Sequence, residues 1–152
     1  MIENPRDKQL NLDMREDPLS RDSFLGDDQR DIKEIIADDA AILAEAGIAA
    51  VKIAEKMRAL TQAGLGCRGE ERSVGAYTVQ VKEYMGFIGC PFKDGHQIAK
   101  RNTTFCNEDG KTITWTDANI HLIEAHGFFE GRGAEYRLEP MDLIDFLELK
   151  AE

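Results

Sequence analysis

The sequence has little cysteine, little histidine and no long apolar run. Three Cys and three His occur among 152 residues. Three Cys cannot all pair, and no Cys-x-x-Cys motif is present, so free thiols in a reducing compartment are expected. No apolar run approaches the roughly 20 residues of a membrane span, and the first residues lack the basic and then apolar character of an export signal. The sequence therefore predicts a cytoplasmic protein that does not enter a membrane.

An excess of basic residues is also absent. The chain carries 19 Lys and Arg against 29 Asp and Glu, which gives a formal net charge of −10. Nucleic-acid binding needs clustered basic side chains to neutralise phosphates, and the pair Lys100–Arg101 is too small a cluster. We therefore expect no nucleic-acid partner. With 42% hydrophobic and 32% charged residues, the composition is that of a globular chain with one core.

Composition divides the chain into three segments. Residues 1–30 are polar, Asp-rich and interrupted by Pro5 and Pro18, which predicts a flexible acidic arm. Residues 31–66 have the composition of a long amphipathic helix that ends at a pair of glycines. Residues 67–152 contain strand and turn patterns followed by helix patterns, which predicts a small α+β domain.

The helical segment has a regular apolar seam. Residues 31–63 contain no Pro and are rich in Ala, Glu and Lys, and the seam recurs in alternating steps of four and three residues. One continuous helix would extend about 50 Å, so either Gly47 interrupts it or part of it pairs with another chain. We predict a homodimer through residues 31–63; packing of the helix on its own sheet is the alternative. Asp39 is the one polar member of the seam, which comprises Ile32, Ile36, Asp39, Leu43, Ala46, Ala50, Ile53, Met57 and Leu60.

Residues 67–116 have the pattern of a small antiparallel sheet. Residues 67–75 resemble a loop, and residues 77–82 alternate apolar and polar side chains as a half-buried strand does. Two Thr-rich arms around the turn at 107–110 predict a hairpin over about residues 100–116.

Two short helices are predicted to follow the sheet. Thr116 can cap a helix that stops at Gly127, and Pro140 suits the first turn of a final helix. Residues 135–138 between them suggest a short strand or extended segment. A helical segment, an antiparallel sheet and two short helices together predict the α+β class.

Five of the six Cys and His residues lie between residues 90 and 126. Cys90, Cys106, His121 and His126 form a Cys₂His₂ set of the kind that binds Zn²⁺ tetrahedrally, and His96 is a substitute ligand. The spacing departs from zinc motifs, because fifteen residues separate the two Cys. Moreover, residues five apart on a regular helix diverge by about 140°. Zinc is the one cofactor that the sequence suggests.

A nucleophilic cysteine is the alternative chemistry. Cys90 lies in a Gly-Cys-Pro turn, where His96 or His121 could act as its base. No catalytic signature supports this reading, and the segment 121–126 matches neither HExxH nor HxxEH. We therefore favour a protein that is not an enzyme.

The segment 127–133, GFFEGRG, suggests a ligand site. Phe128 and Phe129 could line a small-molecule pocket, and Arg132 or Arg137 could hold an anionic group. The alternative, which we favour, is that the Phe pair fills the core. Acidic residues around this segment are expected on a solvated face; they are Glu124, Glu130 and Glu135.

The sequence thus predicts a small cytoplasmic binding or assembly protein. It would associate with itself through residues 31–63, with structural zinc as the suggested addition. The second hypothesis is a small enzyme or ligand-binding protein. In that case the pocket would lie between residues 89–96 and 126–133 and would use a Cys/His pair.

Overall fold

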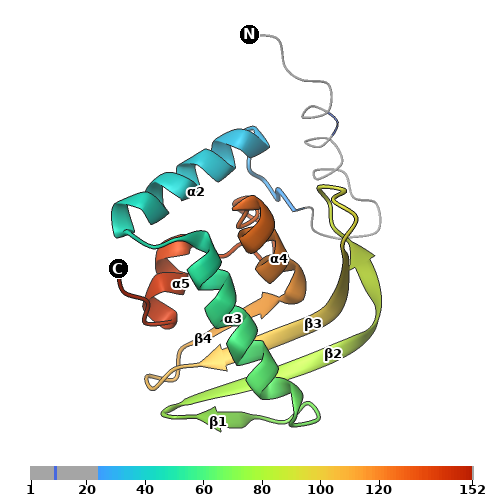
Figure 1. Ribbon diagram of the computed structural model, residues 1–152, viewed down its shortest axis with the longest axis vertical. Coiled ribbons are helices and arrows are strands. Elements are labelled where there is room, and N and C mark those ends of the chain that lie inside the picture. Colours follow the sequence, from blue (N-terminus) through green and yellow to red (C-terminus); the bar gives the residue numbers. More distant parts are fainter. Residues whose placement is uncertain (1–8, 10–23, 152) are drawn as a thin grey trace.

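The computed structural model describes Gln9 and residues 24–151, so most of the predicted acidic arm lies outside the described residues. Four strands form one antiparallel sheet with the order β1-β2-β3-β4. Helices precede and follow it (Figure 1), which confirms the α+β class. The elements are α2 (Ile32–Ala46), α3 (Ala50–Leu65), β1 (Arg72–Val74), β2 (Tyr77–Gly89), β3 (Gln97–Cys106), β4 (Thr112–Thr116), α4 (Asp117–His126) and α5 (Pro140–Phe146).

The prediction of one long amphipathic helix over residues 31–66 is wrong. The segment forms two helices of 15 and 16 residues, α2 and α3, which meet at an angle in Figure 1. Gly47 ends α2 in the left-handed conformation, with φ of 73°, and its N–H bonds back to the last turn. Glycine adopts this conformation at little cost. Of the two alternatives given for the length of this segment, interruption at Gly47 is therefore the one observed.

Most of the apolar seam of the two helices is buried within the same chain. Ile53 and Met57 on α3 are fully buried, and α3 lies across the sheet (Figure 1). The two layers approach closely at Gly64, where an added Cβ would lie 2.7 Å from Val81. The seam therefore serves the core of the chain itself, and the homodimer through residues 31–63 stays a prediction.

The hairpin predicted over residues 100–116 is present as β3 and β4. Its side chains that face α3 include Thr103 and Trp115, and both are fully buried. Thr61 of α3 shares a 2.8 Å hydrogen bond with Thr103 and accepts a 3.0 Å bond from Trp115 Nε1. These polar contacts fix the helix on the sheet. The sequence reading missed strand β1, which lies within the predicted loop at residues 67–75.

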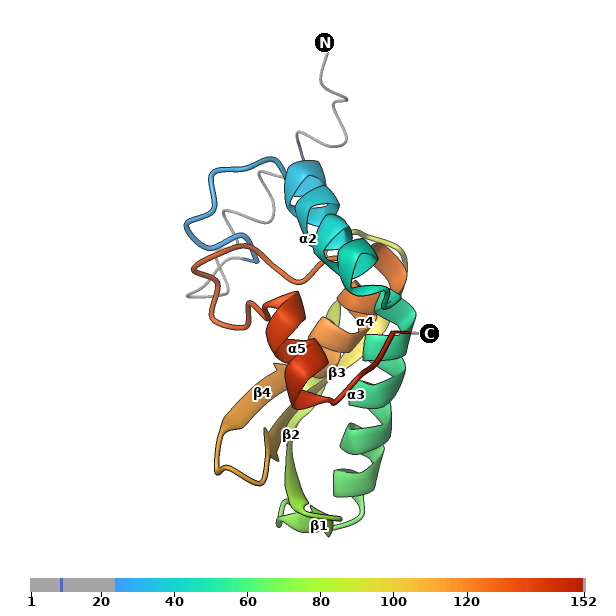
Figure 2. The same ribbon diagram turned by 90° about the vertical axis from the view of Figure 1, so that its left-hand side faces the viewer.

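The short helix α4 begins after Thr116 and ends before Gly127, as the sequence predicts. Thr116 accepts the backbone N–H of Asn119, and the Asn119 side chain accepts the backbone N–H of Thr116. Gly127 ends the helix with φ of 62°. Pro140 begins α5, also as predicted. Residues 135–138 do not form a strand; Figure 2 shows the segment between α4 and α5 projecting on the side away from α3.

The buried side chains form two apolar clusters. The larger joins α3, the sheet and α5 around Trp115. The smaller joins α2, the end of β2 and α4, and it contains Cys90 and Phe128. Phe128 and Phe129 are both fully buried, so the Phe pair fills the core. None of the helices within residues 24–151 combines the length and the hydrophobicity that crossing a bilayer requires.

Candidate metal centre

The turn between β2 and β3 presents a thiol and a carboxylate together. Cys90 donates its backbone N–H to the His96 carbonyl at 3.0 Å, and its own carbonyl accepts from Lys93 at 2.9 Å. Within this turn Asp94 Oδ1 accepts the backbone N–H of His96 at 3.0 Å. These bonds hold the Asp94 side chain in place and leave its second oxygen, Oδ2, for other partners.

Helix α4 brings two imidazoles to that oxygen. Asp94 Oδ2 lies 2.7 Å from His121 Nε2 and 2.8 Å from His126 Nε2. The Cys90 Sγ atom lies 3.6 Å from the same His126 nitrogen. One ligand atom from each of these four residues lies within 4.8 Å of the other three. We call Cys90, Asp94, His121 and His126 the metal cluster, because it could hold a metal ion.

The two imidazoles converge although they are five residues apart. His126 is the last residue of α4, directly before left-handed Gly127, and its ring stacks on Phe92 with centroids 4.0 Å apart. Phe92 in turn contacts the buried ring of Phe128 edge-on. The turn and the core therefore orient the His126 ring. The rings of His121 and His126 meet nearly at right angles, with centroids 5.6 Å apart, and their Nε2 atoms point at one carboxylate.

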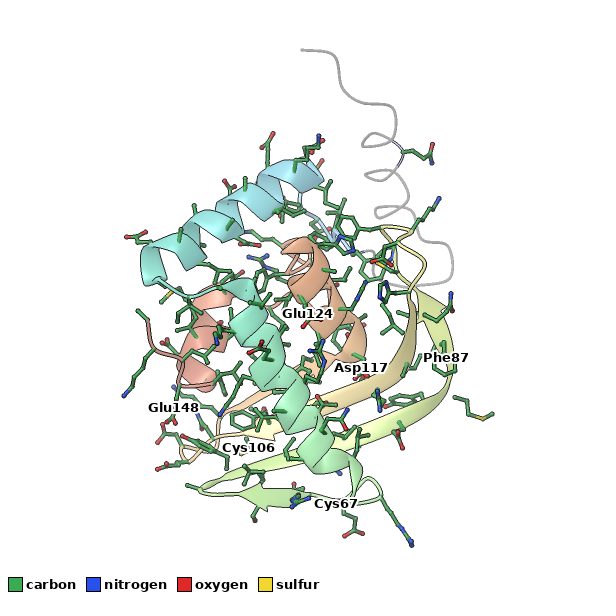
Figure 3. The ribbon with its side chains drawn as sticks, viewed as in Figure 1. Cys67, Phe87, Cys106, Asp117, Glu124 and Glu148 are labelled. Carbon is green, nitrogen blue, oxygen red and sulfur yellow. The ribbon has the colours of Figure 1, made fainter. Side chains whose placement is uncertain are left out.

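Three of the four ligands predicted from the sequence meet in the cluster, and Cys106 does not. Cys106 ends β3 at the opposite end from the 90–96 turn, beside the hairpin turn (Figure 3). A ten-residue strand is about 30 Å long, so both ends of β3 cannot contribute to one metal site. Asp94 supplies the fourth ligand instead. The sequence reading missed it because one acidic residue among 29 carries no signal of its own.

Electrostatics in the cluster favour a charged carboxylate and a protonated thiol. The His96 backbone N–H holds the pKa of Asp94 well below its usual range, and the imidazoles of His126 and His121 add to this effect. Burial raises the pKa of the Cys90 thiol. A carboxylate only accepts hydrogen bonds, so each Nε2 that bonds to Asp94 must carry a proton. A metal ion would take the place of these protons and of the thiol proton.

One of the three short distances in the cluster already suits a tetrahedral ion, and the other two would have to lengthen. With Zn–S bonds of about 2.3 Å and Zn–N or Zn–O bonds of about 2.0 Å, neighbouring ligand atoms lie about 3.3–3.8 Å apart. The contact of Cys90 Sγ with His126 Nε2, at 3.6 Å, already has this length. The two contacts between Asp94 and the imidazoles are hydrogen bonds and would lengthen by about half an ångström around such an ion.

The same geometry disfavours a catalytic Cys90. In a Cys–His–Asp relay the thiol and the carboxylate use opposite nitrogens of the ring. Here Cys90 and Asp94 both approach Nε2 of His126. His96, one of the predicted bases, instead points its Nδ1 at Asp94 Oδ1, 3.2 Å away, with an exposed ring. The raised pKa of the thiol also lowers its reactivity.

The residues predicted to bind an anionic ligand have structural partners. Arg137 forms a two-pronged ion pair with buried Asp39 and also binds Glu139. Asp39, the polar exception in the helix seam, is thereby paired. Arg132 is exposed and donates its backbone N–H to Asp28. With Phe128 in the core, Arg137 serves to attach the 127–139 segment to α2.

Comparisons with known proteins add no further guide to the site. No model of a protein family, no curated protein and no solved structure matches this chain. The function therefore has to be argued from the contacts of the described residues.

Proposed function

We propose that this protein is a small zinc-binding protein, in which one Zn²⁺ fastens the 90–96 turn to helix α4. The observation that carries the proposal is the meeting of four ligand atoms within 4.8 Å. They come from two elements, the 90–96 turn and α4, which strands β3 and β4 separate in the chain. A metal ion at this point would cross-link the turn to the helix.

The chemistry of the ligands favours zinc over the common oxygen-binding ions. Ca²⁺ and Mg²⁺ take oxygen ligands almost entirely, whereas a thiolate and two imidazoles suit Zn²⁺. Four protein ligands also complete a tetrahedral shell, which is typical of structural zinc rather than of a catalytic site with an open position. The proposed role of the metal is therefore to organise a binding surface, and not to activate water.

Metal content and affinity test this proposal directly. The protein is purified without added metal, and zinc is measured by mass spectrometry and by competition with a chromophoric chelator. We expect about one Zn²⁺ per chain, with at least a tenfold loss of affinity in Cys90→Ser and Asp94→Asn. Asp94 is a partly exposed turn residue, so its variant should fold even if the Cys90 variant does not.

Two matched variants distinguish a specific site from loose thiol or imidazole binding. Cys106→Ser removes a thiol outside the cluster, and His96→Ala removes an exposed imidazole beside it. Both should retain the zinc affinity of the wild type within about twofold. Cobalt substitution should give a thiolate-to-metal absorption band that vanishes only in Cys90→Ser. A wild type that binds no zinc at micromolar concentration, or a Cys106→Ser variant that loses it, would contradict the proposal.

Self-association through residues 31–63 is a separate proposal with its own test. Most seam residues are buried within the chain, so a second copy would have to use the outer surface, where α3 exposes Val51. Sedimentation equilibrium of the wild type should give twice the chain mass of 17.0 kDa, and Val51→Glu should give the single mass. Equal masses for both proteins would exclude this interface.

A further inference from the structure

A cavity lies between the sheet and the segment that follows α4. Its volume is about 270 Å³, and Tyr84, Ile88, Glu130 and Tyr136 are among its lining residues. Residues 99–102 of β3 also line it, together with Ala118 of α4. The cavity therefore lies where β3, α4 and the 127–139 segment meet. We call it the Glu130 pocket.

Glu130 is a buried acid, contrary to the solvated position that the sequence suggested. It is 5% exposed, and it has a positive φ of 68°, which is strained for a residue other than glycine. Its Oε2 accepts a 2.9 Å bond from Asn119 Nδ2. Among the described residues, no other group donates a hydrogen bond to this carboxyl. Oε1 is not one of the buried side-chain atoms that lack a partner, so it is open to the solvent in the pocket, where a ligand can reach it.

The two arginines near Glu130 are paired with other carboxylates. Arg137 donates to the backbone carbonyl of Glu130 at 2.8 Å, while its charge is paired with Asp39 and Glu139. Arg101, a second lining residue, is 2.7 Å from Asp117. Glu130 thus lacks a side-chain ion pair among the described residues. Burial raises its pKa to about 8, although Asn119 and Arg137 oppose the shift and Glu135 adds to it.

The other lining residues suit a ligand that has an apolar body and a cationic end. Phe24, Tyr84 and Tyr136 contribute aromatic rings, which attract cations over their faces. Glu135 adds a second carboxylate at the pocket. Lys100 also lines it and is exposed, so its ammonium group can extend into water. The net charge of −10 further favours a positive ligand.

We propose that the Glu130 pocket binds a small organic amine, whose ammonium group pairs with the Glu130 carboxylate and whose apolar part packs among the aromatic rings. The volume limits the ligand to about one ring with a short aminoalkyl arm. Glu130 is mostly protonated at neutral pH, so binding releases its proton to the solvent. The charged ligand then takes the place of that proton.

Calorimetry with 2-phenylethylamine as the probe tests the proposal on the full chain. The neutral control is 2-phenylethanol, which has nearly the same shape without the charge. We expect the amine to bind at least tenfold more tightly than the alcohol. Titrations at pH 7 in phosphate and in Tris, whose ionisation enthalpies differ, should show that close to one proton is released per amine bound.

The matched variants are Glu130→Gln and Glu135→Gln. Gln has the shape of a protonated Glu and can still accept from Asn119, so Glu130→Gln should fold, and unchanged Trp115 fluorescence would verify this. It should lose the preference for the amine and the proton release. Glu135→Gln should weaken binding by less than about threefold. Equal binding of amine and alcohol by the wild type, no binding of either at millimolar concentration, or retained amine preference in Glu130→Gln would overturn the proposal.

Discussion

The 90–96 turn contains Asp94, and the 127–139 segment contains Glu130. The surroundings of these two carboxyl groups shift their pKa values in opposite directions. Asp94 is partly exposed and meets N–H groups from His96, His121 and His126, so its pKa is lowered. Glu130 is buried with one amide donor, and its pKa rises to about 8. The charged form of a carboxylate is stabilised by donors and destabilised by burial. Asp94 is therefore suited to binding a metal ion, and Glu130 is suited to exchanging a proton.

The two regions also differ in how they are attached to the helices. Arg137 joins the 127–139 segment to α2 through Asp39, with both side chains almost fully buried. The 90–96 turn is joined to α4 by the metal cluster, whose contacts a bound ion would strengthen. We expect the first attachment to persist whether or not metal is present, and the second to depend on bound metal. Four predictions test this difference.

Breaking the ion pair between Arg137 and Asp39 should have the largest effect on stability. Arg137→Ala leaves the buried Asp39 carboxylate without its partner, which typically costs about 3–5 kcal/mol of unfolding free energy. Urea unfolding followed by Trp115 fluorescence measures this loss. The control is Arg58→Ala, which removes an exposed pair with Glu124 and should cost less than about 1 kcal/mol.

A double variant tests whether the unpaired Asp39 carboxylate causes the loss of stability. Adding Asp39→Asn to Arg137→Ala removes that charge, and we expect part of the lost stability to return. If Arg137→Ala costs no more than Arg58→Ala, the 127–139 segment is not held by this ion pair.

Metal removal should affect the turn and leave the other region unchanged. With free zinc at a hundred times its dissociation constant, binding adds about 2.7 kcal/mol of stability, and a chelator should remove this amount. Hydrogen exchange followed by mass spectrometry should speed up at residues 90–96 after chelation. Exchange at 128–139 should stay the same. Faster exchange in both regions would show that they are not attached independently.

The pH dependence of stability should distinguish Glu130 from the other acids. A buried acid with a raised pKa binds its proton more tightly in the folded state, so its contribution falls as pH rises from about 4.5 through about 8. Within this window the slope is about −1.4 kcal/mol per pH unit, or about 2 kcal/mol between pH 5.5 and 7.

Glu130→Gln removes this titration, so the wild type should lose stability relative to the variant as pH rises. Urea unfolding of both proteins at several pH values measures the difference, in which titration of the metal cluster cancels. A difference that is constant with pH would mean that Glu130 is charged throughout.

The sequence predicts the local features well, because each rests on neighbouring residues. The Thr116 and Gly127 caps, the hairpin turn and the helix start at Pro140 are of this kind. Cys90, His121 and His126 are predicted ligands because Cys and His are rare in this chain.

The features that the sequence does not predict depend on tertiary contacts. Asp94 and Glu130 are two acids among 29, and only the turn geometry and the burial distinguish them. Cys106 fits the zinc pattern by residue type, but β3 carries it away from Cys90. The sequence offers the break at Gly47 as one of two alternatives, and the burial of most of the seam within the chain decides between them.

The smallest predicted effect is at Gly127, which lies between His126 of the metal cluster and buried Phe128. Its φ of 62° lies in the left-handed region, and an added Cβ would meet nothing closer than Ile36 at 3.8 Å. Gly127→Ala should therefore cost about 1–2 kcal/mol through the backbone alone. Gly66→Ala is the control, because Gly66 has φ of −75° and open space around it, so little change is expected.

The same substitution should affect the metal cluster and spare the ion pair. His126 precedes Gly127, so a shifted helix end would move its imidazole and lower zinc affinity several-fold, as measured by chelator competition. The stability lost on Arg137→Ala should be the same in the Gly127→Ala background, since no hydrogen bond within the described residues joins the two sites. If zinc affinity stays at the wild-type value while stability falls, the end of α4 does not position His126, and the stacked ring of Phe92 alone orients it.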